Sequence, residues 1–249
     1  MKVSLILTTF NNENRLPLTL DSIEKQDYED IEVIIKDGGS SDRTLEIAED
    51  YAGRSKYSYF ITRSDDKGIY DAMNQGIAFA KGEIIAPFND QFVTENAVSK
   101  LVNAIECAPD VIGVHSDLVY TRDGKVVRYW KNGPQKSIYT GWMPGHPTLF
   151  LKRGVYDKYG LYDDSYIIAA DYEFMVRFLS DKKVHNKLAY VPEVLVDMDY
   201  GGTSNKSFRS YIESLKEGHR ALKQNGISPA FIIDCLRTLT VLRQFCRKK

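Results

Sequence analysis

Hydroxyl, amide and carboxylate side chains follow the short apolar runs in the first half of this 249-residue sequence. Such groups can form hydrogen bonds with a base or a ribose, an aromatic ring can stack on a base, and a lysine beside a glycine can pair with a phosphate. Together they suit a nucleotide. The set comprises Thr8, Thr9, Phe10 and Asn11 after the first run, Asp37 after the second, Lys67 and Asp71 after the third, and Asn89 and Asp90 after the fourth.

Apolar runs and segments of helical periodicity alternate through this half. The expected strands cover residues 2–7, 31–36, 57–61 and 83–88, and the expected helices cover 15–26, 45–51, 69–80 and the region of 98–105. This order predicts a mostly parallel, doubly wound sheet with right-handed crossovers. Because the carboxyl ends of parallel strands meet at one edge of a sheet, the polar residues are expected to share one crevice.

The second half has a different pattern. Runs at 111–120 and 125–130 flank an Asp-Gly pair that is typical of a hairpin turn, and further strands are expected at 146–152 and 193–200. A mixed second half that shares one sheet with the parallel first half is the simplest arrangement. The fold class is therefore α/β, with helices at the C-terminus.

Composition narrows the functional classes. A net charge of -1, with 43% hydrophobic and 27% charged residues, indicates a globular protein and argues against a general nucleic-acid binder. Three widely spaced cysteines fit a reducing compartment better than a disulfide framework. The first apolar run is too short for a signal peptide and no run approaches a membrane span, so we expect a cytoplasmic protein.

Two common nucleotide-binding motifs are absent from the sequence. A dinucleotide-binding fold needs G-x-G-x-x-G after the first strand, but the loop there reads "TTFNNENR". A P-loop is also absent, and the lack of a Gly-rich phosphate loop disfavours a nucleotidyltransferase.

Six blocks of the sequence resemble, in order, those of the inverting family-2 glycosyltransferases of GT-A fold, in particular bacterial members that build polysaccharides. The blocks are "VSLILTTFNN", "VIIKDGGSSDRTLEI", "SDDKGIYDAMNQGIAFAKGEII", "GHPTLFLKRGVYDKYGLYDD", "IAADYEFMVRF" and "GGTSN". The resemblance implies one GT-A domain over residues 1–225, in which 1–92 bind the donor and 93–225 the acceptor, followed by a C-terminal helix over 226–249.

The activity implied is transfer of a hexosyl or N-acetylhexosaminyl group from a nucleoside-diphosphate sugar, with a UDP-sugar favoured. The acceptor would be a glycan or a lipid-linked molecule in cell-surface polysaccharide synthesis. The alternative is a non-catalytic nucleotide-sugar-binding protein with a degenerate metal site.

The family's donor-binding residues carry over onto matching positions of this chain. By this resemblance, Thr8, Thr9 and Phe10 line the base pocket with Asn11 beside them, Asp37 accepts a hydrogen bond from the base or ribose, and Lys67 and Asp71 border the donor. Either Asn89 or Gln91, which flank Asp90, is expected to contact a metal-bound water or the ribose. The glycine-rich segment 200–205 is expected to be either a flap over the donor or a simple turn.

Asp90 falls in the segment that carries a metal-binding Asp-x-Asp or Asp-Asp pair in relatives. The chain reads "FNDQF" there, so Asp90 is the only acid. Mg²⁺ typically keeps several waters and is held by one or two protein carboxylates plus substrate phosphates, so one Asp can hold Mg²⁺ or Mn²⁺. The alternatives are an Asp that only caps a turn, and a metal-free site in which Lys67 bears the charge of the diphosphate.

Asp171 matches the position of the family's catalytic base. Phe174, Met175 and Phe178 lie three, four and seven residues further on, so the carboxylate shares the core-facing stripe of its helix. An acid on an apolar stripe is either a general base or a buried N-cap. His146, between two prolines, is expected either to touch the diphosphate or metal, or to be structural.

The last 31 residues carry seven Lys or Arg and one Asp, and a helical wheel separates them into two faces. One face has Arg237, Thr240, Arg243, Gln244 and Arg247, and the other has Phe231, Cys235, Leu239, Leu242, Phe245 and Cys246. Such a helix could lie on the inner face of the plasma membrane, pack on the domain, or join a second subunit.

Overall fold

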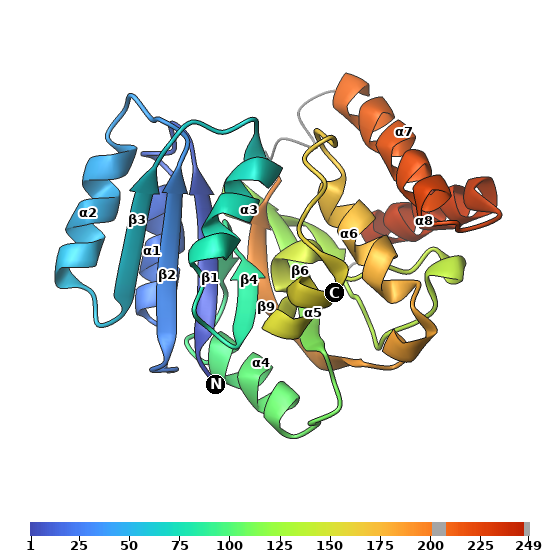
Figure 1. Cartoon of the computed structure of the whole chain (residues 1–249), viewed down its shortest axis with the longest axis horizontal. Coiled ribbons are helices and arrows are strands. Elements are labelled where there is room, and N and C mark those ends of the chain that lie inside the picture. Colours follow the sequence, from blue (N-terminus) through green and yellow to red (C-terminus); the bar gives the residue numbers. More distant parts are fainter. Residues whose placement is uncertain (201–207, 247–249) are drawn as a thin grey trace.

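The computed structural model describes residues 1–200 and 208–246 and contains one nine-stranded sheet (Figure 1). In its first half the expected alternation is confirmed. The elements are β1 (Val3–Thr9), α1 (Leu16–Glu24), β2 (Ile31–Asp37), α2 (Thr44–Arg54), β3 (Ser58–Arg63), α3 (Ile69–Phe79), β4 (Ile84–Pro87) and α4 (Ala97–Glu106). Strands β3, β2, β1 and β4 are neighbours in this order and run parallel.

Helices cover both faces of the sheet because the strands are apolar on both faces. Along β1, Val3, Leu5 and Leu7 join the core under α1, α2 and α4, whereas Ile6 joins the core under α3 and α6. Side chains of successive strand residues point to opposite faces, so a continuous apolar run supplies two cores. This packing fixes the edge at which the parallel strands end.

The second half extends the same sheet with mixed strand directions. Its elements are β5 (Gln91–Phe92), β6 (Gly113–Arg122), β7 (Lys125–Trp130), β8 (Phe150–Lys152), α5 (Arg153–Tyr159), α6 (Ala170–Leu179) and β9 (Leu188–Asp199), with short 3₁₀ turns η1 (Ile138–Thr140), η2 (His146–Thr148) and η3 (Lys182–Val184). The hairpin between β6 and β7 is confirmed, with Asp123 and Gly124 both at positive φ, as its tight turn requires.

Two strand predictions need correction. The segment 146–152 was expected to be one strand, but 146–148 form η2, since Pro147 lacks an N–H and the Thr148 hydroxyl bonds the Gly145 carbonyl. Strand β9 begins at Leu188 and not at 193, and it pairs with β5, which the sequence pattern did not reveal. This pairing places Gln91 opposite Asp197, and so brings the end of β9 beside Asp90.

Two C-terminal helices, α7 (Phe208–Gln224) and α8 (Ala230–Cys246), lie beyond α6 at one end of the sheet (Figure 1). Among the described residues, no helix has the length and apolar content needed to cross a membrane. The segment 201–205 of the expected flap lies outside the described residues.

Candidate active site

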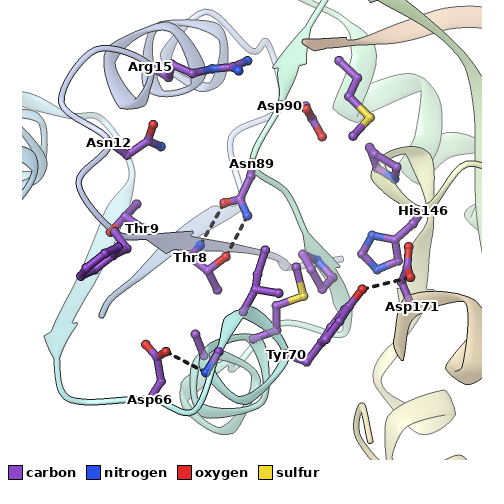
Figure 2. A pocket seen from close by; sticks show the side chains of 18 of the residues that line it. Thr8, Thr9, Asn12, Arg15, Asp66, Tyr70, Asn89, Asp90, His146 and Asp171 are labelled. Atoms are coloured by element: carbon purple, nitrogen blue, oxygen red, sulfur yellow. Dashed lines mark hydrogen bonds between the residues drawn. The ribbon is translucent and has the colours of Figure 1, made fainter. Parts of the chain in front are cut away.

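A cavity of about 810 Å³ opens where β1 and β4 end, and residues of the second half line its other side (Figure 2). Its volume is in the range of small-molecule sites. Eight predicted site residues line it, namely Thr8, Thr9, Phe10, Asn11, Asn89, Asp90, His146 and Asp171. The other three, Asp37, Lys67 and Asp71, are not among its lining residues.

Asn89 joins the ends of the two central parallel strands. Its Oδ1 accepts a hydrogen bond from the Thr8 amide (2.9 Å), and its Nδ2 donates to the Thr8 hydroxyl (2.8 Å). Because both ends of the amide are engaged by Thr8, the main contact of Asn89 is with the protein. These two hydrogen bonds fix the position of Asn89, which directly precedes Asp90.

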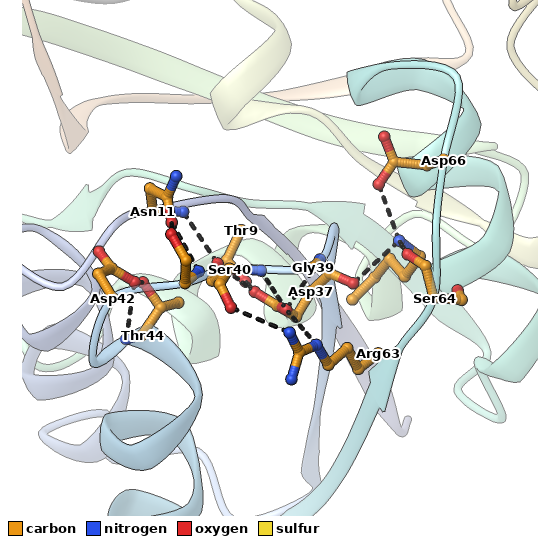
Figure 3. A network of polar contacts seen from close by, with 12 residues as sticks. Thr9, Asn11, Asp37, Gly39, Ser40, Asp42, Thr44, Arg63, Ser64 and Asp66 are labelled. Atoms are coloured by element: carbon orange, nitrogen blue, oxygen red, sulfur yellow. Dashed lines mark hydrogen bonds and ion pairs between the residues drawn. The ribbon is translucent and has the colours of Figure 1, made fainter.

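Asp37 organises the loop that follows β2 (Figure 3). Its side chain is buried and accepts hydrogen bonds from the amides of Gly39 (3.0 Å) and Ser40 (2.9 Å) and from the Thr9 hydroxyl (3.3 Å). The Arg63 guanidinium lies 3.8 Å away. These contacts favour a role in positioning the loop, and the hydrogen bond to a base or ribose stays a prediction.

The loop after β1 presents an aromatic face to the cavity. Phe10 is 65% exposed and lines the cavity, as a ring that stacks on a base must. Asn11 adopts a left-handed conformation (φ 47°), and its Oδ1 accepts from the Ser41 amide (2.9 Å) while its own amide donates to the Ser40 hydroxyl (2.9 Å). Asn tolerates this conformation better than most residues. Its hydrogen bonds to Ser40 and Ser41 hold the loop that carries Phe10.

Lys67 and Asp71 are not part of the cavity lining. The Lys67 side chain is 81% exposed and its ammonium lies 3.7 Å from Asp164. Asp71 accepts from the Lys67 amide (3.0 Å) and from the Gln75 side chain (3.0 Å), and so stabilises the start of α3. The buried cation of this region is Lys36, whose ammonium bonds Asp66 (2.8 Å) and the Ser64 carbonyl (2.7 Å).

Asp90 faces the cavity beside two acids and one cation. Burial raises the pKa of the Asp90 carboxyl to about 7, with Asp197 and Asp199 acting in the same direction and Arg15 in the opposite one. Arg15 and Asp199 form an ion pair and both line the cavity. Among the described lining residues, Arg15 is the only Lys or Arg.

The donor atoms around Asp90 fit a divalent cation. No hydrogen bond or ion pair between described residues engages the Asp90 carboxylate, and Oδ1 of Asp197 is buried without a hydrogen-bond partner there. In the described part of the chain, no group of three or more His, Cys, Asp or Glu side chains could hold a metal ion by itself. One or two carboxylates would hold Mg²⁺ or Mn²⁺ only together with waters and phosphate oxygens.

Asp171 lies in the first turn of α6 and lines the cavity. Phe174, Met175 and Phe178 are buried as the sequence pattern predicts, and the N-cap is Ala169, so Asp171 is not the N-cap. The Tyr70 hydroxyl lies 3.2 Å from Oδ1 of Asp171 and also donates to the Ile168 carbonyl (2.6 Å). Burial raises the pKa of Tyr70, which therefore stays a neutral donor.

Glu217 of α7 fixes the chain that leads into α6. Its buried carboxylate accepts hydrogen bonds from the amides of Ile167 (2.8 Å), Ile168 (2.9 Å) and Ala169 (2.8 Å). A carboxylate at the N-terminus of a helix also interacts favourably with the helix dipole. Glu217 thus positions Asp171 from a distant part of the sequence.

His146 lines the cavity from η2, and its Nε2 lies 2.8 Å from the Tyr162 hydroxyl. Burial lowers the pKa of His146, and the nearby Asp171 opposes this only in part. The imidazole is therefore neutral near pH 7 and can offer a lone pair or a proton to a ligand.

Sequence reasoning missed Arg15, Asp199, Tyr70 and Glu217. Asp197 and Asp199 form an Asp-x-Asp pair at the end of an expected strand, which was a usable signal. Arg15 and Tyr70 lie close to expected loops but follow no motif. Nothing in the sequence around Glu217 links it to Asp171.

Solved structures with similar folds define the class of the protein. One is residues 1–349 of TarS from Staphylococcus aureus in complex with UDP, with a TM-score of 0.66 and 18% identity, covering 100% of this chain and 73% of that chain. Another is a mannosyltransferase from Pyrobaculum calidifontis in complex with GDP-Man and Mn²⁺, with a TM-score of 0.68, 16% identity, and coverage of 100% and 76%. This chain therefore has the GT-A glycosyltransferase fold.

Sequence comparison identifies the family. Residues 4–163 match the family model of Glycosyl transferase family 2, and the chain belongs to this family. A "PGL/p-HBAD biosynthesis glycosyltransferase" of Mycobacterium tuberculosis is 30% identical over 219 residues, which cover 81% of this chain and 78% of that protein. An uncharacterized glycosyltransferase of the same species is 31% identical over 184 residues, covering 70% and 68%. The protein is a glycosyltransferase.

Proposed function

We propose that this protein is an inverting glycosyltransferase that moves a sugar from a nucleoside-diphosphate donor to a hydroxyl of a glycan or lipid-linked acceptor. The observation that carries the proposal is that Phe10, Asp90 and Asp171 line the same cavity. An aromatic face, a metal-binding carboxylate and a base are then available to the two ends of one activated sugar. UDP is the nucleotide we favour: TarS was solved with UDP, whereas the mannosyltransferase was solved with GDP-Man, so both nucleotides belong in the test.

The reaction requires one proton transfer and one displacement. Asp171 takes the proton of the acceptor hydroxyl as its oxygen forms a bond with the anomeric carbon. The bond between this carbon and the diphosphate oxygen breaks on the opposite face, and the nucleoside diphosphate leaves with the electron pair. The Tyr70 hydroxyl shares its single proton between the Ile168 carbonyl (2.6 Å) and the Asp171 carboxylate (3.2 Å), and so helps to orient Asp171 before the acceptor binds.

Charge on the leaving diphosphate needs a counterion. A divalent metal bound at Asp90 supplies Lewis-acid stabilisation of this charge. Arg15, which lines the same cavity, supplies a second positive charge where the sequence analysis considered Lys67. Asp199 holds Arg15 toward the cavity in the absence of a donor.

The second candidate function, a non-catalytic nucleotide-sugar-binding protein, is favoured only by the single acid in "FNDQF". Asp171 would have no role in such a protein. Its place in the cavity, held by Tyr70 and by the loop that Glu217 fixes, favours the enzyme.

The test is release of nucleoside diphosphate from a panel of UDP-, GDP-, CMP- and dTDP-sugars with Mn²⁺ and candidate acceptors. Asp171→Asn is expected to lower kcat by about 10² to 10⁴-fold, the range typical of general base catalysis, with little change in donor Kd. Asp157→Asn, on the exposed side of α5, is the matched control. Donor binding without turnover by the wild type, or an unchanged kcat in Asp171→Asn, would contradict the proposal.

A further inference from the structure

Helix α8 packs on the protein through both apolar and polar residues. Ala230 and Ile233 are buried in the core, and two polar residues also face the domain. Gln244 is buried and accepts a hydrogen bond from Arg128 (2.8 Å), and the Arg237 guanidinium lies 4.1 Å from the Tyr172 ring centroid. Gln244 and Arg237, which the sequence places on the polar face of the helix, therefore contact the domain.

Several large apolar side chains of α8 are exposed on its other side. Phe231 is 73% exposed, Ile232 54%, Leu239 51% and Leu242 56%, and Cys235 is also exposed. We call these five residues the α8 stripe. They recur at helical spacing along the outer side of α8, and none carries a charge. A contiguous group of large exposed apolar side chains indicates a surface that binds a protein, a membrane or a ligand.

We propose that the α8 stripe binds the surface of an anionic lipid membrane. Charge complementarity supports this occupant. After Leu242 the sequence contains Arg243, Arg247, Lys248 and Lys249 and no acid. A helix with an exposed apolar stripe, in a segment whose sequence is rich in basic residues, can lie at the lipid interface, with attraction of basic residues to anionic headgroups adding to apolar burial.

Size argues against a second copy of the chain as the occupant. A helix of 17 residues is about 25 Å long and about 10 Å wide, which gives a projected area of roughly 250 Å². A stable interface needs about 800 Å² per partner. A single stripe is therefore too small to hold a dimer, whereas a membrane requires no matching surface.

The stripe is also linked to the acceptor side of the cavity. Arg237, on the packed face of α8, stacks on Tyr172, which directly follows Asp171. His219 of α7 bonds Asp234 of α8 (2.7 Å), and α7 carries Glu217. A membrane-bound α8 would thus hold the acceptor side of the cavity near the lipid surface, where a lipid-linked acceptor lies. This last step rests on the proposed function, whereas membrane binding itself does not.

The experiment is co-sedimentation of the full chain with vesicles of phosphatidylglycerol and phosphatidylcholine, and with vesicles of phosphatidylcholine alone. The wild type is expected to bind the anionic vesicles and to bind more weakly as salt rises. Leu239→Asp/Leu242→Asp is expected to lower the bound fraction at least about 10-fold, because two apolar side chains that would be buried in the lipid are lost. Val126→Asp/Val127→Asp is the matched control, since these β7 residues are similarly exposed (44% and 40%).

A second measurement keeps the proposal testable if the double variant folds poorly. An environment-sensitive fluorophore on Cys235, with the other cysteines replaced by Ser, should shift to the blue on anionic vesicles. The same label on Cys107, which is exposed at the end of α4, should not shift.

Three outcomes would overturn the proposal. They are no binding to either vesicle, equal loss of binding in the β7 control, and a concentration-dependent dimer that Leu239→Asp/Leu242→Asp abolishes. Soluble-acceptor turnover measured in parallel separates the two proposals, since loss of membrane binding alone should leave this activity unchanged.

Discussion

On the β1–β4 side of the cavity, hydrogen bonds join neighbouring parallel strands or residues a few positions apart, such as Asn89 with Thr8 and Asp37 with Ser40. On the α6 side, Asp171 is held by Tyr70, 101 residues away, and its loop by Glu217, 48 to 50 residues away. The difference teaches that the order of the parallel strands builds most of the donor side, with the Arg15–Asp199 ion pair as the exception. The acceptor side depends on how α3 and α7 pack against α6.

The largest expected effect in this comparison is that of Glu217→Ala. Three backbone amides lose their acceptor, and each unsatisfied buried group costs about 1 to 3 kcal/mol, so the free energy of unfolding should fall by about 3 kcal/mol or more. If the two sides are independent, kcat should fall while donor Kd stays close to the wild-type value. Urea unfolding and isothermal titration with UDP measure the two quantities.

Glu213→Ala is the matched control, because Glu213 lies on the same helix and only pairs with Lys216 at 3.8 Å. It should change stability by less than about 0.5 kcal/mol. A loss of donor affinity as large as the loss of rate in Glu217→Ala would show that the two sides are coupled.

A smaller change in the free energy of unfolding is expected when the pH is lowered. It should originate in the second half of the chain. His115 of β6 is fully buried, and neither ring nitrogen has a hydrogen-bond partner among the described residues. It packs between Tyr190 and Trp142. Burial lowers the pKa of His115 to about 4. The buried Lys36 and Asp37 of the first half, in contrast, are both paired.

The direction of the change in stability with pH follows from the pKa of His115 in the folded and unfolded chains. The unfolded chain binds a proton at His115 near pH 6.5 and the folded chain only near pH 4, so stability is full above pH 6.5 and falls as pH drops toward 4. Between pH 8 and pH 5 the loss should be about 2 kcal/mol. His115→Phe should remove this component, measured as the difference in urea midpoint against pH. Identical pH profiles of the two proteins would exclude His115 as the cause.

The smallest expected effect lies on the donor side and compares two cations. Arg15→Gln should weaken UDP binding about 10-fold, since a charge-assisted hydrogen bond contributes about 1.5 kcal/mol or more. Lys67→Gln should change it less than 2-fold, because Lys67 is 81% exposed and outside the cavity. Titration calorimetry with UDP and Mn²⁺ distinguishes them. The reverse order would restore Lys67 as the diphosphate-binding residue.

Much of the site was predictable because parallel strands must end at one edge. Thr8 and Phe10 lie at the end of β1 and Asp90 follows β4, and all three line the cavity. Lys67 was harder to place, since a residue in a loop between a strand and a helix can point either way. The contributions of Arg15 and Asp199 were hidden, because they lie 184 residues apart and meet only through the β5–β9 pairing.

The sequence by itself determined the parallel strands of the first half, the family, and the apolar stripe of α6 that has Asp171 in its first turn. These follow from local periodicity and from motifs, which each segment carries alone. Only the tertiary structure decided that Arg15 lines the cavity, that Glu217 fixes the chain before Asp171, and that the α8 stripe is exposed. Each of these features depends on contacts between residues that are far apart in the chain. Local periodicity and motifs do not reveal such contacts.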